Sequence, residues 1–144
     1  MKYHFKIHKE KNGFWAECIE LHGCVSEAFT MRTLLANVQE ALNLFLDEPE
    51  NSKALFPEPR KIALAKNIIE VRVDPKIAFA MILRQERIRS HLSQMQVAKK
   101  LGLKNTYSYQ RLENSKTANP SLTTIVSLKS IFPDLDLETI VAPG

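Results

Sequence analysis

The sequence lacks most of the features that mark secreted and membrane-bound proteins. Its 144 residues include only two cysteines, Cys18 and Cys24, whereas a secreted disulfide scaffold of this length usually carries more. No apolar run approaches the roughly 18 residues that a membrane-spanning helix needs. Residues 1–15 alternate apolar and charged side chains and contain no apolar core of a signal peptide. We therefore expect a cytoplasmic protein with no membrane partner.

The two cysteines and the histidine between them form the candidate metal set. They follow the pattern Cys18-x3-His22-x-Cys24, which supplies three ligands at a spacing that matches no common zinc motif. Reduced, half-buried thiols are the favoured interpretation, so we expect no metal and no other cofactor. A cysteine nucleophile is also disfavoured, because adjacent residues of a strand point to opposite faces and no oxyanion site is evident.

Charge is distributed unevenly along the chain. Residues 1–75 hold ten Lys and Arg against eleven Asp and Glu, whereas residues 76–144 hold ten against five. Within residues 76–116 the count is nine against two. This asymmetry predicts two units, the second of which faces a polyanion, although a solvated helical face is the plainer alternative.

Hydrophobic periodicity changes at about residues 74–76. Before that point, period-two patterns predict strands over residues 3–8, 14–20, 23–29 and 68–73. Lys11-Asn12-Gly13 predicts a turn between the first two, in which Asn-Gly supplies positive φ values. Thr30 can cap a helix that ends near Asp47, and residues 48–67 are irregular. The apolar stripe of that helix comprises Leu34, Val38, Leu42 and Phe45.

From Lys76 onward the period is 3.6, which predicts helices. Ser93 can cap the second of them, Asn105 or Thr106 opens the third, and Pro120-Ser121 starts the fourth. The fold class is therefore α+β, with a sheet and one main helix in residues 1–74 and an all-α unit in residues 75–144. The two units meet at Asp74-Pro75 without a flexible Gly/Ser linker.

Residues 95–116 meet the requirements of a helix-turn-helix. Ala98 is small enough for two helices to cross there, and Gly102 allows the backbone of the turn. Tyr109 and Leu112 can anchor the second helix. The side chains that can face outward from it are Thr106, Tyr107, Gln110 and Arg111.

The stretch LSQMQVAKKLGL…YQRLENSKTANPSLTTIVSLKSIF resembles the Cro/repressor-type helix-turn-helix family over about residues 76–141. By this resemblance Thr106 and Tyr107 match base-reading positions, and Arg111 matches another one turn later. Lys104 looks like a one-residue insertion in the turn. Arginine can grip guanine O6 and N7 bidentately, and lysines near the backbone add salt-dependent affinity. The full set predicted to contact DNA is Gln94, Lys104, Asn105, Thr106, Tyr107, Ser108, Arg111 and Lys116.

The first half combines the hairpin, the segment LHGCV at residues 21–25, the helix with Asn37, Glu40 and Ala41, and the closing strand. By these features it resembles the HicB family of antitoxins over about residues 3–75. His22 stands where that family usually has proline. The resemblance implies a partial RNase H-like βββαβ fold without nuclease activity. It also implies a partner, a small basic HicA-type toxin that cleaves mRNA.

Together the two resemblances predict the antitoxin of a type II toxin–antitoxin system. It would inhibit the toxin and repress its own operon by binding operator double-stranded DNA as a homodimer or higher even oligomer. We expect no catalytic residue, because the carboxylates are dispersed, and we expect the histidines of the first strand to face solvent. A single-component regulator with an N-terminal ligand-sensing domain is the alternative, and a ribonuclease or hydrolase with a DNA-binding tail is a third. The predicted toxin contacts are Trp15, Glu17, Glu20 and Glu27, of which the three glutamates are expected to face solvent.

Overall fold

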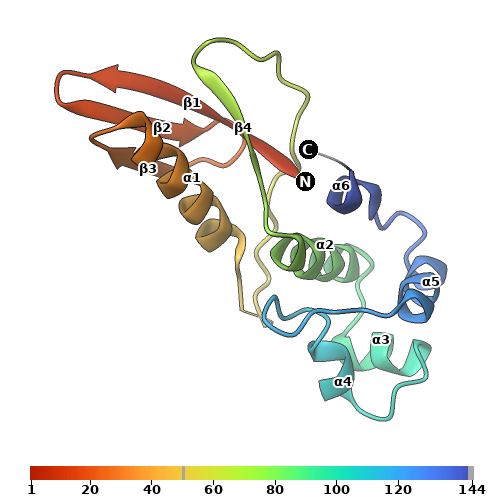
Figure 1. Cartoon of the computed structure of the whole chain (residues 1–144). Coiled ribbons are helices and arrows are strands. Elements are labelled where there is room, and N and C mark those ends of the chain that lie inside the picture. Colours follow the sequence, from red (N-terminus) through yellow and green to blue (C-terminus); the bar gives the residue numbers. More distant parts are fainter. Residues whose placement is uncertain (50, 143–144) are drawn as a thin grey trace. The chain divides into compact units, whose positions relative to one another are not determined.

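A computed structural model describes residues 1–49 and 51–142 (Figure 1). Over these residues the chain forms a four-stranded antiparallel sheet and six helices, which confirms the predicted mixture of α and β structure. It divides into two compact units. Of the described residues, the first unit comprises Met1–Leu46 and Phe56–Asp74, and the second comprises those of Asp47–Leu55 and of 75–142. Asp47–Leu55 thus groups with the C-terminal helices, although the division at residue 74 assigns it to the first unit.

The first unit is a sheet with one helix on it. The sheet contains β1 (Lys2–Glu10), β2 (Gly13–Cys18), β3 (Val25–Ala28) and β4 (Ile68–Arg72) in the order β3-β2-β1-β4. Helix α1 (Met31–Leu46) lies along one face, where the strands bury alternate side chains such as Tyr3, Phe5 and Ala16 (Figure 1). The helix contributes Leu34, Val38, Leu42 and Leu46 to this core.

Two details of the first unit differ from the sequence prediction. Leu46 rather than Phe45 completes the buried stripe of α1, because the buried residues recur every four positions from Leu34. The hairpin turn is Lys11-Asn12, and only the following Gly13 has a positive φ, of 151°. A Cβ on Gly13 would lie 2.6 Å from the carbonyl oxygen of Ala28, so glycine is required here by close approach of the backbone as well as by φ.

The second unit is all helical over its described residues. It contains α2 (Pro75–Arg89), α3 (Gln94–Lys100), α4 (Thr106–Gln110), α5 (Leu122–Ile131) and α6 (Glu138–Val141). The predicted caps are present, since Ser93 forms a capping box on α3, Asn105 caps α4 and Ser121 caps α5. The central core comprises Phe79, Leu83, Val97, Ala98, Tyr109, Ala118, Leu128, Phe132 and Leu135.

None of the described helices combines the length and apolar character that would be needed to cross a membrane.

Candidate nucleic-acid interface and sheet surface

The connection between α3 and α4 is closed by backbone hydrogen bonds around Gly102. The N–H of Gly102 donates to the carbonyl of Lys99 at 3.0 Å, and that of Leu103 donates to Ala98 at 3.0 Å. Gly102 has a φ of 72°, as expected for the left-handed residue that ends a helix in this hydrogen-bond pattern. Ala98 is buried against the core. The turn therefore fixes the direction in which α4 leaves α3.

Asn105 and Ser108, two of the predicted DNA contacts, bind each other at the start of α4. The Asn105 Oδ1 atom accepts from the backbone N–H of Ser108 at 2.9 Å and from its hydroxyl at 3.0 Å. This cap satisfies backbone donors of the first turn of α4. Both residues thus hold the geometry of the helix, whatever else they contact.

The remaining predicted DNA contacts lie around α4 at the surface or half-buried. Lys104, Tyr107, Arg111 and Lys116 are exposed, and Thr106 is half-buried. Arg111 occupies the C-cap of α4 with helical dihedral angles. No carboxylate of the described residues lies within ion-pair distance of its guanidinium group. The geometry therefore gives no support to a purely structural role for Arg111 in an ion pair with a neighbouring acid.

Arg87 and Glu113 form a buried ion pair that the sequence did not predict. The side chain of Glu113 is fully buried and accepts from Arg87 Nε at 2.6 Å and Arg87 Nη2 at 3.0 Å. Burial lowers the pKa of Arg87, but the hydrogen bond and charge of Glu113 outweigh it, so the pKa of Arg87 is raised. Arg87 also donates to the carbonyl of Leu92 at 3.0 Å. The pair therefore connects α2 to the end of α4 and to the start of α3.

Gln94, predicted to contact DNA, belongs to the same network. Its Nε2 donates to Glu113 Oε1 at 3.2 Å, and its Oε1 accepts from Gln110 Nε2 at 3.0 Å. Gln110 was recognised as outward-facing but was not assigned a role. The side chains of α3 and α4 are therefore joined to one buried charge pair.

Two of the nine cations in residues 76–116 add nothing to the exposed positive charge. Arg87 is engaged with Glu113, and Arg84 is only 1% exposed. Burial lowers the pKa of Arg84, and its Nε and Nη2 atoms have no hydrogen-bond partner among the described residues. The exposed cations of α3, of the turn after it and of residues 111–116 define what we call the basic surface. They are Lys99, Lys100, Lys104, Arg111 and Lys116.

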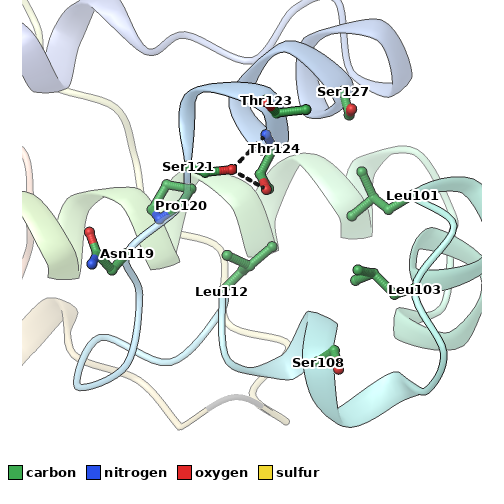
Figure 2. A pocket seen from close by; sticks show the side chains of 10 residues that line it. All are labelled: Leu101, Leu103, Ser108, Leu112, Asn119, Pro120, Ser121, Thr123, Thr124 and Ser127. Carbon is green, nitrogen blue, oxygen red and sulfur yellow. Dashed lines mark hydrogen bonds between the residues drawn. The ribbon is translucent and has the colours of Figure 1, made fainter.

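A cavity of about 390 Å³ opens beside the basic surface, between the turn after α3 and the start of α5 (Figure 2). Its lining includes Leu101, Leu103 and Leu112 together with hydroxyl and amide side chains. Ser121 and Thr124 in its wall bind each other through their side chains at 2.9 Å. No lining residue is acidic, basic or a histidine, so the cavity offers no catalytic acid or base.

In the first unit, three predicted toxin contacts lie on the sheet face opposite α1. Trp15 pairs with Glu27 in the register of β2 and β3, and Glu17 follows on the same face of β2. Trp15 stacks on His8 with ring centroids 4.1 Å apart, and Glu17 Oε2 lies 3.5 Å from His8 Nε2. We call Trp15, Glu17 and Glu27 the sheet surface.

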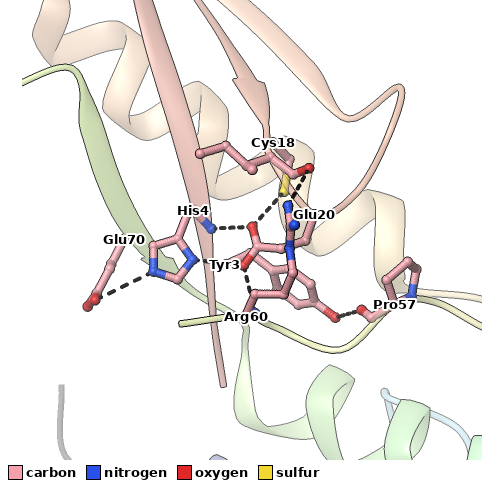
Figure 3. Close-up of polar contacts among 8 residues, drawn as sticks. Tyr3, His4, Cys18, Glu20, Pro57, Arg60 and Glu70 are labelled. Atoms are coloured by element: carbon pink, nitrogen blue, oxygen red, sulfur yellow. Dashed lines mark hydrogen bonds and ion pairs between the residues drawn. The ribbon is translucent and has the colours of Figure 1, made fainter. Parts of the chain in front are cut away.

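The prediction that Glu20 faces solvent is wrong. Its side chain is fully buried and accepts from the backbone N–H of His4 at 2.9 Å, His4 Nδ1 at 2.7 Å and the N–H of Arg60 at 3.2 Å (Figure 3). His4 is only 5% exposed, so its predicted solvent exposure is wrong as well. Glu20 lies beyond the end of β2 at Cys18, where strand alternation no longer determines which side chains face inward. His4 lies within β1, and its ring is buried because it faces Glu20 on one side and Glu70 on the other.

The neighbourhood of Glu20 does not form a catalytic cysteine site. Cys18 Sγ lies 3.8 Å from Glu20 Oε1, whereas the other ring nitrogen of His4 faces Glu70 Oε1 at 3.7 Å (Figure 3). Burial raises the pKa of Cys18 to about 11 and that of Cys24 to about 12. Both thiols are free and buried. They are therefore protonated side chains of the core and poor nucleophiles.

Neither a protein-family model nor a curated protein matches this chain. Functional assignment therefore depends on the two surfaces themselves. Within the described residues, no group of three His, Cys, Asp or Glu side chains is arranged to hold a metal ion. What the geometry offers is a basic helical surface in one unit and an aromatic and acidic sheet surface in the other.

Proposed function

We propose that the chain is a HicB-type antitoxin that inhibits a HicA-type toxin and represses its own operon by binding operator DNA. The observation that carries the proposal is the basic surface. Of the two acids in residues 76–116, Glu113 is buried in an ion pair and Glu86 is half-buried on α2. The exposed cations around α3 and α4 are therefore available to phosphates, and Arg111 is available to a base edge.

The arrangement of elements supports both halves of the proposal. The order β1-β2-β3-α1-β4 is the order implied by the resemblance to HicB antitoxins. Helices α3 and α4, joined through Gly102, suit a helix-turn-helix whose second helix enters the major groove. In this proposal the chain acts as a dimer or larger even assembly, because two such helices read half-sites about one helical turn apart.

The DNA-binding half is tested on the full chain by footprinting and by affinity measurements on operator and random duplexes. Arg111→Ala should cost roughly 1–3 kcal/mol on the operator and relax base preference at one position. Lys116→Ala should weaken binding to all sequences alike and reduce its salt dependence. The control Lys61→Ala removes an exposed charge of the same sign from the first unit and should change neither. Equal protection of operator and random DNA by the unaltered chain would contradict this half.

The toxin-binding half assigns the sheet surface to a basic partner. Trp15 supplies a large, half-exposed aromatic ring, and Glu17 and Glu27 beside it supply negative charge. Aromatic residues are enriched at binding hot spots, and complementary charge speeds association. The burial alternation of β2 places Trp15 and Glu17 on one face, and the pairing of β2 with β3 places Glu27 opposite Trp15 on that face, so a single partner can contact all three.

Co-expression with a HicA-type toxin, taken from the adjacent gene where that gene encodes a small basic protein, followed by purification, tests this assignment. The chain should co-purify with that protein and silence its RNase activity, and Glu27→Lys should weaken both effects. The control Glu40→Lys makes the same charge change at an exposed position of α1, on the other side of the sheet. Loss of the complex in Glu40→Lys with retention in Glu27→Lys would refute the sheet surface as the binding site.

A further inference from the structure

The amide group of Gln110 has an orientation that the buried ion pair determines. Gln110 lies on α4 one turn after Thr106 and next to Arg111, both of which were predicted to read bases. It donates from Nε2 to Gln94 Oε1 at 3.0 Å. An isolated glutamine amide can turn its oxygen and nitrogen over, but this one is part of a chain of bonds with a fixed direction.

The direction starts at Arg87, which has only donors. Glu113, held by two bonds from that guanidinium group, can only accept. Gln94 must therefore turn its NH2 group to Glu113, at 3.2 Å. Its side-chain oxygen is then left for a donor from α4. That oxygen can accept only from the NH2 group of Gln110. The Arg87–Glu113 pair thus fixes the orientation of the Gln94 amide, and Gln94 in turn fixes which atoms of the Gln110 amide are left for another partner.

Gln110 is half-buried, and its Oε1 and second N–H have no hydrogen-bond partner among the described residues, so these two atoms are left for another partner. One acceptor beside one donor is the complement of adenine in the major groove, which offers the N6 amino group and N7. Guanine offers two acceptors, N7 and O6, so the outward oxygen of Gln110 would face O6 unfavourably. The fixed amide therefore distinguishes the two purines.

We propose that Gln110 reads an adenine of the operator and that Gln94 is a positioning residue that holds the reading amide in one orientation. This inference rests on the proposed function, because it requires α4 to enter the major groove. It adds a specificity-determining residue to the predicted contacts and assigns Gln94 a role that does not need direct contact with DNA.

The test uses the full chain and a duplex selected from a random library for binding to it. Each adenine is replaced in turn by 7-deazaadenine, which lacks the N7 acceptor. In each half-site one replacement should weaken binding of the unaltered chain by about ten-fold, in line with one bidentate contact. Gln110→Ala should bind more weakly and be indifferent to that replacement. Arg111→Ala should also bind more weakly but keep the sensitivity, because it contacts a different base.

Two further variants test the orientation itself. Gln110→Glu presents only acceptors, and its preferred base should change from adenine to cytosine, whose N4 amino group donates. Gln94→Ala leaves Gln110 in place but frees its amide to turn over, so discrimination between adenine and guanine at that position should fall several-fold. Circular dichroism should show that both variants keep the helical content of the unaltered chain.

The outcomes separate this inference from the proposed function. If the unaltered chain selects an operator but every 7-deazaadenine replacement affects it and Gln110→Ala equally, Gln110 does not read adenine and the proposed repressor still stands. If Gln94→Ala discriminates adenine from guanine as well as the unaltered chain, Gln94 is not a positioning residue. If the unaltered chain selects no sequence at all, operator binding fails and the inference fails with it.

Discussion

Replacement of Glu20 by alanine should destabilise the first unit by about 3–5 kcal/mol, the usual cost of removing one partner from a buried polar pair. The carboxylate accepts from two backbone N–H groups, those of His4 and Arg60, and from the His4 ring. Without it, each buried donor that stays unpaired costs roughly 1–3 kcal/mol. Because an entire domain is typically stable by only about 5–15 kcal/mol, this loss is a large fraction of the total.

The assay follows Trp15 fluorescence during urea unfolding of the full chain. Trp15 is the single tryptophan and lies in β2, so its emission reports on the first unit rather than on the helical one. Glu20→Ala should lower the urea midpoint strongly without changing the slope of the transition. Glu20→Gln keeps the volume and one acceptor oxygen, so its urea midpoint should fall between those of the unaltered chain and Glu20→Ala.

The control is Glu17→Ala, which removes a carboxylate of β2 whose side chain is 44% exposed. Surface substitutions of this kind usually change stability by no more than about 0.5 kcal/mol. If Glu20→Ala and Glu17→Ala shift the midpoint equally, the buried carboxylate does not stabilise the unit, and the argument from its hydrogen bonds is wrong.

Two further predictions concern the same unit. The raised pKa values of Cys18 and Cys24, about 11 and about 12, predict that at pH 8 alkylation is slower in the folded than in the urea-unfolded chain, by about 100-fold for Cys18 and about 1,000-fold for Cys24. Above pH 9 the folded state keeps its thiol protons, whereas the unfolded thiols lose theirs. The free energy of unfolding should therefore fall as pH rises from 9 toward 12. A rise over this range would contradict the burial of the thiols. Gly13→Ala should cost roughly 1–3 kcal/mol, because its Cβ would overlap the carbonyl of Ala28. Gly23→Ala, at a φ of 91° with no atom near the new Cβ, should cost less, and equal shifts of the urea midpoint would show that only backbone strain matters.

Features set by nearby residues were predictable from the sequence. The caps at Ser93 and Asn105 depend on bonds to a residue three positions away, and the alternation of Tyr3 and Phe5 depends only on the period of a strand. The mixed α and β content follows from the same periodicities. The sequence therefore places most helices and strands within a few residues of their observed bounds.

Features that depend on distant residues were not predictable in this way. Glu20 is buried because it meets His4 and Arg60, which lie 16 and 40 positions away, and Glu113 meets Arg87 at a separation of 26. Nothing in the local pattern distinguishes either glutamate from a solvated one. A buried acid needs partners that only the tertiary fold brings to it.

These burials also change how charge counts are interpreted. The sequence counts nine cations in residues 76–116, but Arg84 is buried and Arg87 is engaged with Glu113. Of the seven cations that remain, five lie on α3, in the turn after it and in residues 111–116, whereas Lys76 and Arg89 lie at the two ends of α2. In the first unit, the loss of Glu20 from the surface leaves Glu17 and Glu27 beside Trp15, which makes the sheet surface smaller and more sharply defined than the sequence suggested.

The path of the chain limits how a change in one unit could affect the other. The sequence indicated a single joint at Asp74-Pro75, but the chain leaves the first unit after Leu46, re-enters it at Phe56 and leaves it again after Asp74. Asp47, the residue that follows α1, accepts a hydrogen bond from the Ser115 hydroxyl at 2.6 Å, in the loop behind α4. A strain at the end of α1 would therefore act, through the next residue, on the segment that follows Arg111. A flexible insertion after Asp74 alone would leave this connection intact. Any coupling between the proposed toxin binding and DNA binding would then persist in that variant. Flexible insertions after Leu46 and after Leu55 are needed as well to make the two units independent.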